Sequence, residues 1–461
     1  MRGTLRRLVS RLAVLALPAI TLLIMAEPAR AVPSFAAQTG QPCSACHIGS
    51  FGPQLTPLGR AFKIGGYTQG GGQGWLAKIP FAGMILGSFT HTDAAQPDAA
   101  APHFARNNNP ALDQVSLFLA GRLTDYAGAF VQGTYDGVDH SFALDNTDLR
   151  LTTPLDLKDT ELRLGLSVNN GPTVQDPYNS SFAWIFPFAT SRLAPTPAAQ
   201  PLLAGGLIGN SVGATVYAWY DRSLYLEAGG YNTYGPTLLK VTGTTLGPGS
   251  TANVAPYARV AYEWNWAGQS AHVGGLLLHS NLNPAIADRT VDGSFGRDGY
   301  TDVAIDAGYQ FLGDRTHVAT IDGIFTHENQ NLRGSLGMGT SSRAANHLNQ
   351  IRLNLAYWYQ GTYGLNLGWQ NTWGDANAAL YAPTPVTGSA NGKPNSNSFT
   401  IEADWVPFGK EDSWARPLAN LKLGAQYTIY TRFNGGSRNY DGFGRNASGN
   451  DTLFLYAWLA F

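Results

Sequence analysis

The chain has 461 residues and a formal net charge of −1 at pH 7. Only 13% of its residues are charged, against about 25% in ordinary soluble domains. The balanced charge, with no basic stripe, excludes a typical nucleic-acid-binding protein.

The amino-terminal stretch, residues 1–31, predicts a secretory signal peptide. Four arginines (Arg2, Arg6, Arg7 and Arg11) accompany an apolar run at 12–26, and the small residues of Ala29-Arg30-Ala31 suit a signal-peptidase site. The run is shorter than the roughly 20 residues that a membrane-spanning helix needs. We therefore expect export and cleavage before Val32.

The motif Cys43-Ser44-Ala45-Cys46-His47 contains the only two cysteines of the chain. Two thiols at this spacing can each bond one vinyl group of a porphyrin, and the adjacent imidazole can ligate the iron. A redox dithiol is expected near a βαβ pattern, a zinc site needs about four ligands, and a structural disulfide leaves His47 without a role. We expect one covalent haem c on Cys43 and Cys46, with His47 as an axial ligand.

Residues 80–461 predict a β-barrel, because segments about 10 residues long alternate apolar and polar side chains. In the clearest segment, 300–311, Val303 and Ile305 share one face while Asp302 and Asp306 share the other. Such alternation suits a wall between lipid and a wet lumen. A soluble all-β protein is the alternative, since alternation alone does not distinguish lipid from a protein core.

Counting these segments predicts a 16-stranded antiparallel transmembrane β-barrel, with strands beginning near residues 80, 111, 126, 143, 160, 207, 222, 254, 270, 299, 315, 346, 361, 398, 419 and 451. Long connections are expected at 93–110, 169–206, 232–253, 280–298, 328–345, 375–397 and 432–450, alternating with mostly short turns; 137–142 is the exception. Bacterial barrels have even strand numbers and short periplasmic turns. We therefore expect a multi-pass protein of the bacterial outer membrane with both termini in the periplasm.

The last segment alternates Leu453, Leu455, Ala457, Leu459 and Phe461, ending on an aromatic residue. That pattern resembles the terminal signal read by the bacterial barrel-assembly machinery. Several large aromatic residues are candidates for the girdles at the bilayer interfaces, namely Trp369, Trp373, Trp405, Trp414, Tyr456 and Trp458.

Residues 32–79 form the haem-binding segment and include a glycine-rich stretch, 65–74, that is typical of a flexible linker. A domain below about 60 residues is marginal alone, and this one must also cover a large apolar ring. We expect the barrel to supply the missing walls, with the segment entering the lumen as a plug and the haem inside or at the mouth of the pore.

Three runs, AVPSFAAQTG at 31–40, CSACH at 43–47 and QLTPLGRAFKIGGY at 54–67, resemble the start of the fused monohaem cytochrome-porins of outer membranes. The resemblance implies thioether links at Cys43 and Cys46 and His47 as proximal ligand. The best-known members are iron-oxidising outer-membrane cytochromes, which pass electrons from extracellular Fe(II) to periplasmic carriers. This chain departs from their pattern at Ala37, where arginine is usual, and at 48–53, where it is longer.

Sequence leaves the distal haem ligand open. Met84 has the parity of a lumen-facing residue, and several histidines near predicted loop ends could ligate iron or bind a metal donor: His91, His103, His140, His327 and His347. Arg60 and Lys63 are candidates to pair with haem propionates.

Three functions fit these features. The first is an electron conduit from an extracellular reductant such as Fe(II) to a periplasmic carrier such as a c-type cytochrome. The second is a solute porin whose haem-bearing segment is a plug or redox sensor. The third is a haem enzyme such as a peroxidase, which requires an open sixth coordination site. No other catalytic motif is identifiable from spacing.

Overall fold

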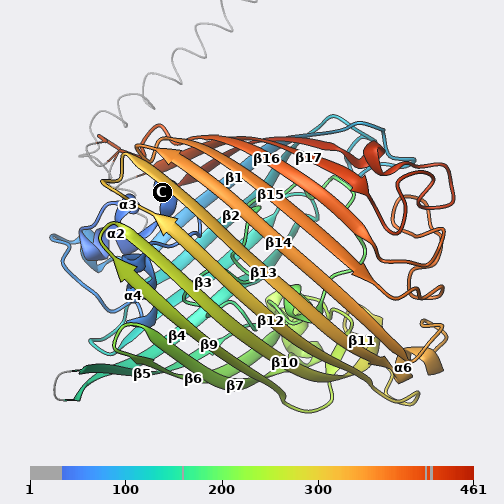
Figure 1. Cartoon of the computed structure of the whole chain (residues 1–461), viewed down its shortest axis with the longest axis horizontal. Coiled ribbons are helices and arrows are strands. Elements are labelled where there is room, and N and C mark those ends of the chain that lie inside the picture. Colours follow the sequence, from blue (N-terminus) through green and yellow to red (C-terminus); the bar gives the residue numbers. More distant parts are fainter. Residues whose placement is uncertain (1–33, 158–159, 411–412, 416–418) are drawn as a thin grey trace, which may run out of the picture.

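The computed structural model describes residues 34–157, 160–410, 413–415 and 419–461, so the expected signal peptide at 1–31 lies outside the described residues. The main body is one closed antiparallel β-barrel (Figure 1). Its wall consists of sixteen long strands: β1 (Phe81–Thr92), β2 (Asn109–Arg122), β3 (Ala127–Asp136), β4 (Ser141–Leu157), β5 (Thr160–Asn169), β6 (Ser211–Tyr220), β7 (Leu224–Thr233), β9 (Ala255–Trp266), β10 (Gln269–Ala287), β12 (Asp298–Phe311), β13 (His317–Leu332), β14 (Ala345–Tyr359), β15 (Tyr363–Gly374), β16 (Ser396–Trp405), β17 (Asn420–Arg432) and β18 (Thr452–Ala460). β1 pairs with both β2 and β18, which closes the ring. The predicted 16-stranded fold is confirmed.

Every predicted strand start lies within four residues of an observed one. The expected long connection at 280–298 is wrong in part, because β10 continues to Ala287. Two short strands, β8 (Gly249–Thr251) and β11 (Thr290–Val291), pair with this extension and satisfy backbone groups that would otherwise be free beyond the ring.

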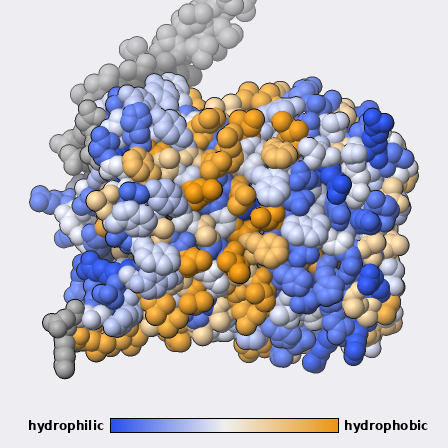
Figure 2. All heavy atoms as spheres, viewed as in Figure 1, coloured by the Kyte–Doolittle hydropathy of each residue, from blue (hydrophilic) through white to orange (hydrophobic). Residues whose placement is uncertain are grey.

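The two faces of the wall have opposite character, as the alternation predicted. On β12, Val303 and Ile305 are 47% and 58% exposed on the outside, while Asp302 and Asp306 are buried inside. Figure 2 shows an apolar band across the outer face between more hydrophilic ends. Within the described ranges, no helix is long and apolar enough to cross a bilayer. The apolar outside and polar inside belong to a transmembrane β-barrel.

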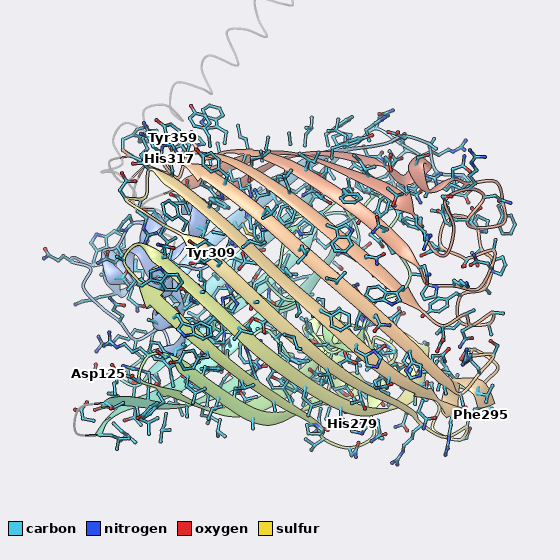
Figure 3. The ribbon with its side chains drawn as sticks, in the orientation of Figure 1. Asp125, His279, Phe295, Tyr309, His317 and Tyr359 are labelled. Carbon is cyan, nitrogen blue, oxygen red and sulfur yellow. The ribbon has the colours of Figure 1, made fainter. Side chains whose placement is uncertain are left out.

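The two ends of the barrel differ. The C-terminus lies at the end with mostly short turns, where Phe461 and Gly83 exchange backbone hydrogen bonds. Tyr309 and Tyr359 lie toward this end and Phe295 lies at the other (Figure 3). Trp405 faces outward and suits a girdle. Tyr456 and Trp458 are exceptions to the girdle expectation. Tyr456 points inward and donates to Glu402 and Asp404, and Trp458 packs on the inward-facing cluster that contains Phe454 and Tyr456.

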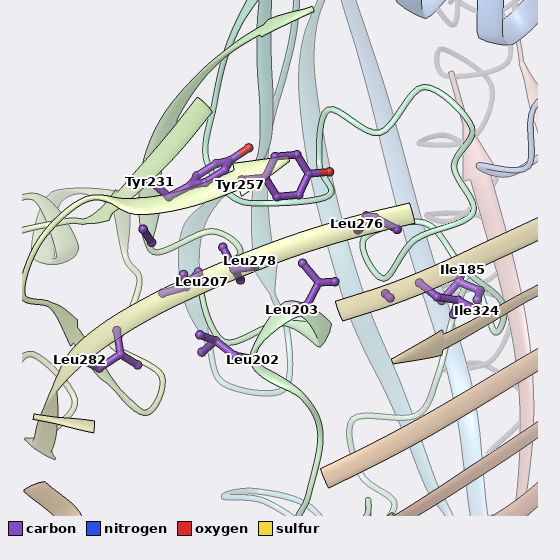
Figure 4. Packing of buried hydrophobic residues seen from close by; sticks show 12 residues of the cluster. Ile185, Leu202, Leu203, Leu207, Tyr231, Tyr257, Leu276, Leu278, Leu282 and Ile324 are labelled. Atoms are coloured by element: carbon purple, nitrogen blue, oxygen red, sulfur yellow. The ribbon is translucent and has the colours of Figure 1, made fainter. Parts of the chain in front are cut away.

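The longest connection, residues 170–210, folds back into the barrel, and we call it the lumen loop. It contains η3 (Leu202–Ala204), and Leu202, Leu203 and Leu207 pack on wall residues of β7, β9 and β10 (Figure 4). Glu328 Oε2 accepts from Leu202 N at 2.5 Å and Asp302 Oδ2 accepts from Leu203 N at 2.6 Å. The loop is therefore part of the lumen filling.

The remaining helices are short. Residues 34–79, which we call the plug, contain α2 (Ser34–Thr39), α3 (Cys43–Cys46), η1 (Ile48–Ser50), α4 (Pro57–Ile64) and η2 (Leu76–Lys78). The end of the barrel opposite the C-terminus carries the long connections, and we call it the loop end; the end with the plug and the C-terminus is the plug end. Three more helices occur in connections at the loop end: α5 (Pro236–Thr242), α6 (Arg333–Gly337) and η4 (Ala447–Asn450).

Candidate functional site

The plug lies in the barrel at the end where the C-terminus lies (Figure 1). Hydrogen bonds join it to strands all round the wall. Gln54 donates to Thr320 and Asp322 on β13, Asn420 on β17 donates to Ser50 O, and Tyr67 donates to Asp148 on β4. The plug is thereby built into the lumen instead of hanging below the barrel.

A buried ion pair anchors the plug through Arg60 on α4. Its Nη2 lies 2.8 Å from Glu263 Oε1 on β9 and 2.6 Å from Ser270 Oγ on β10, and both charged side chains are 1% exposed. Its Nη1 donates to Leu55 O within the plug. The Arg60 guanidinium is thus committed to Glu263, contrary to the expectation that it pairs with a haem propionate.

Half of the residues in the glycine-rich stretch are exposed, but the stretch is not a free linker. Gly72 N donates to Gln38 O on α2 at 2.9 Å. A Cβ at Gly72 would lie 1.8 Å from Ala37 O, so only glycine allows this close approach. The stretch is therefore docked along α2, and the linker expectation is corrected.

The Cys-Ser-Ala-Cys-His motif is held from the side by the start of α4. Thr56 N donates to Cys46 O at 2.9 Å and Thr56 Oγ1 lies 2.6 Å from Ala45 O. A Cβ at Gly59 would lie 2.3 Å from Cys46 O, so the helix packs against the motif backbone. Thr56 also caps α4 by accepting from Gly59 N, and Pro57 occupies the first turn, where its missing N–H costs nothing.

Residues 48–53, which follow the motif, place it against the wall of the barrel. Ile48 and Phe51 pack with Trp358 on β14 and with Val406 and Leu312 in turns. The Phe51 ring also meets Trp458 edge-on at 5.1 Å. Residues 48–53 therefore form an apolar contact between the motif and the barrel.

A cavity of about 1160 Å³ opens beside the motif inside the lumen. Cys43, Cys46 and His47 line it together. Its walls include aromatic side chains from the plug, from β2 and β3, and from the lumen loop: Phe35, Phe62, Phe118, Phe130, Phe182 and Trp184. The cavity combines two thiols, one imidazole and a largely apolar wall, as ligand pockets commonly do.

Burial sets the protonation of the motif. It lowers the pKa of His47 to about 4, so the imidazole is neutral near pH 7. His47 Nδ1 is buried and has no hydrogen-bond partner among the described residues. Burial, reinforced by the neighbouring Cys43, raises the pKa of the Cys46 thiol to about 11. A thiol of this kind is a poor thiolate nucleophile, unlike the cysteines of redox dithiols.

Lys63 also lines the cavity. Its Nζ donates to Val174 O and Asn179 Oδ1, both at 2.9 Å, and lies 4.7 Å from the centre of the Trp184 ring. These partners belong to the lumen loop, so Lys63 joins the plug to that loop.

Of the expected distal-ligand candidates, only Met84 lines the cavity that contains the motif. It is 6% exposed and faces inward from β1, as its parity predicted. The five histidines do not line that cavity. His91, His327 and His347 each engage an asparagine through Nδ1, and His103 packs against His140 at 5.7 Å.

The sequence did not single out Arg352, which also lines the cavity. It lies on β14 between Gln350 and Asn354, whose side chains are 1% and 3% exposed and point inward. The inward parity of Arg352 could have been derived from the alternation, but the lack of a carboxylate partner for it in the described part of the chain could not.

No protein-family model and no curated protein matches the chain. Among solved structures, Pseudomonas putida OprB has a TM-score of 0.50 at 12% identity, over 83% of this chain and 94% of that one. The outer-membrane channel DcaP of Acinetobacter baumannii has a TM-score of 0.46 at 14% identity, over 83% and 96%. An anion-selective porin from Comamonas acidovorans has a TM-score of 0.42 at 13% identity, over 82% and 98%.

The chain has the fold of a porin. Together with the closed ring and the apolar outer band, this makes it a multi-pass β-barrel of the bacterial outer membrane. At these identities the likeness concerns the fold alone, and the plug with its motif is a feature of this chain to be explained from its own residues.

Proposed function

We propose that this barrel is a monohaem c-type cytochrome-porin that conducts electrons across the outer membrane, from an extracellular reductant such as Fe(II) to a periplasmic carrier such as a c-type cytochrome. Cys43 and Cys46 would hold one haem through thioether bonds, and His47 would be an axial ligand of its iron. The observation that carries the proposal is the shared cavity: the only two thiols and the adjacent imidazole open onto one aromatic-walled space inside the lumen.

The residues present fit the group. The low pKa keeps the His47 imidazole neutral, which iron ligation requires, and the unpartnered Nδ1 leaves a ring nitrogen uncommitted. The haem would supply one-electron chemistry, while the protein positions it and sets its surroundings. The plug contacts keep the motif inside the barrel, and the aromatic wall excludes water from one side. Each Fe(II) ion oxidised outside loses one electron, and the periplasmic carrier gains it.

We further propose the orientation of the molecule. The plug, the C-terminus and the mostly short turns share one end, which in bacterial barrels is periplasmic. Both described ends of the chain would then face the periplasm, and a periplasmic cytochrome could approach the plug directly.

The test uses the full chain in liposomes that enclose a c-type cytochrome. We expect the wild type to give a covalent haem signal in the pyridine haemochrome assay and to reduce the enclosed cytochrome when Fe(II) is added outside. The double variant Cys43→Ala/Cys46→Ala should fold as a barrel and do neither. Ser44→Ala, which keeps both thiols, is the matched control. Unchanged reduction of the enclosed cytochrome by the double variant would refute the proposal.

The second candidate function is a solute porin with a haem-bearing plug. It is favoured by the length of the cavity, which extends along the lumen. The lining runs from Cys43 in the plug to Thr387 and Thr452 beside the loop end of the barrel. Planar-bilayer recordings separate the two functions: steady open-channel conductance with haem bound supports the porin, and a closed barrel supports the electron conduit.

A further inference from the structure

Arg352 differs from the other cations inside the barrel. Arg60, Arg150, Arg259 and Lys422 each have a carboxylate within 3.0 Å. Lys63 donates to two oxygens of the lumen loop. Arg352 has no carboxylate at ion-pair distance among the described residues, although it lies on the inner side of β14.

The contacts of Arg352 leave the end of its side chain facing the cavity. Nε donates to Gln350 Oε1 at 3.1 Å, and the guanidinium carbon lies 5.3 Å from the centre of the Phe182 ring in the lumen loop. Neither Nη atom has a hydrogen bond to the described residues, while the residue lines the cavity together with Gln370, which lies opposite it on β15. Two parallel donors are thus presented to the cavity, the geometry that matches a carboxylate.

The position along β14 relates Arg352 to the motif. Ile48, the residue after His47, packs in one cluster with Ala356 and Trp358 at the plug end of the same strand. Arg352 lies four residues from Ala356 toward the loop end, about 13 Å along a strand. A flat macrocycle that begins at the motif and extends into the cavity would bring its far edge toward Arg352.

We propose that Arg352 is a carboxylate-binding residue of the lumen cavity. The carboxylate has two sources: a propionate of the haem in the proposed function, on which this assignment rests, or a free carboxylate solute in the lumen. In both, the guanidinium offers its two Nη donors to the bound carboxylate.

The first experiment uses the haem-loaded full chain in detergent, with the reduction potential measured by optical redox titration. Removing a positive charge beside a propionate stabilises the ferric form, so Arg352→Gln should lower the potential. Arg352→Lys retains the positive charge, so its reduction potential should stay close to that of the wild type. Asn354→Ala, a neutral change on β14 at a residue that does not line the cavity, is the control and should leave the potential unchanged.

The second experiment uses the haem-free barrel of the Cys43→Ala/Cys46→Ala variant, titrated with succinate by calorimetry. A charge-assisted contact of this kind predicts about tenfold weaker binding when Arg352→Gln is added. A potential shift identifies the haem propionate, whereas weaker succinate binding without a potential shift identifies a free carboxylate. If neither quantity changes, the assignment is overturned.

This design separates the inference from the proposed function. If the wild type carries no covalent haem in the pyridine haemochrome assay, the electron conduit fails. The succinate titration still decides whether Arg352 binds a carboxylate, since it needs no haem. Heat-modifiable mobility in gels verifies that each variant retains a folded barrel, and Arg352→Met, which also removes the charge, provides a second test if Arg352→Gln does not fold.

Discussion

The clearest quantitative prediction concerns the ion pair between Arg60 and Glu263, because it joins the plug to the wall. Arg60→Met removes the charge and keeps most of the side-chain volume. Glu263 then remains buried, and its hydrogen-bond partners among the described residues are Asn265 and Ser270. Breaking a buried pair from one side costs about 3–5 kcal/mol, which corresponds to an increase of about two to four orders of magnitude in the equilibrium for plug opening.

Hydrogen exchange of the α4 amides measures that opening directly. Arg60 N and Gly65 N donate within or beside α4 and exchange only when the helix opens. We expect the protection of these α4 amides to fall by about two to four orders of magnitude in Arg60→Met. Amides of the wall strands should keep their protection. In the double variant Arg60→Met/Glu263→Gln, much of the protection should return, because no unpaired charge is left. Unchanged α4 protection in the single variant would refute the view that this pair holds the plug.

Three further predictions follow from the plug and its cavity. Thr56→Ala removes the α4 cap and the bond to Ala45 O, and should destabilise α4 by about 1–2 kcal/mol in the same exchange measurement; a loss confined to β-strands would contradict this. Burial, with the charge of Arg150, lowers the pKa of Lys63 to about 7, below that of an unfolded lysine, so plug stability should rise with pH from about 7 toward 10.5 and Lys63→Met should flatten the rise. If plug stability rises with pH as steeply in Lys63→Met as in the wild type, Lys63 is not the group that causes the rise. Met84→Ala should convert a six-coordinate haem spectrum to five-coordinate if Met84 is the distal ligand; an identical spectrum assigns that role elsewhere.

The sequence predicted the wall well because a barrel strand has a strict period of two. Each inward residue on β12, such as Asp302 or Asp306, is specified by its own neighbours two positions away. The same alternation located the residues at which the strands begin. Tyr456 shows the limit: aromatic character suggested a girdle, but its parity, shared with Phe454, places it inside with Glu402 and Asp404.

The interior was less predictable because its partners are far apart in sequence. The motif itself is local, and Cys43, Cys46 and His47 fall side by side on the cavity as their spacing suggested. Arg60 offered no local sign of Glu263, which lies 203 residues away. The docked glycine stretch and the lumen loop likewise depend on tertiary contacts, which override the composition of a segment.

The plug lies near one end of the lumen, and this asymmetry bears on the proposed electron donor and acceptor. The motif residue Ser44 accepts from Arg315 in a turn at the plug end, so a protein acceptor could come close to the motif from outside the barrel. From the loop end, the approach to Cys43 passes the lumen loop and the residues around Thr387, which line the same cavity of about 1160 Å³. A folded protein donor does not fit such a space, whereas a hydrated metal ion does. In the proposed function, the donor is therefore small and soluble, and the acceptor is the macromolecule.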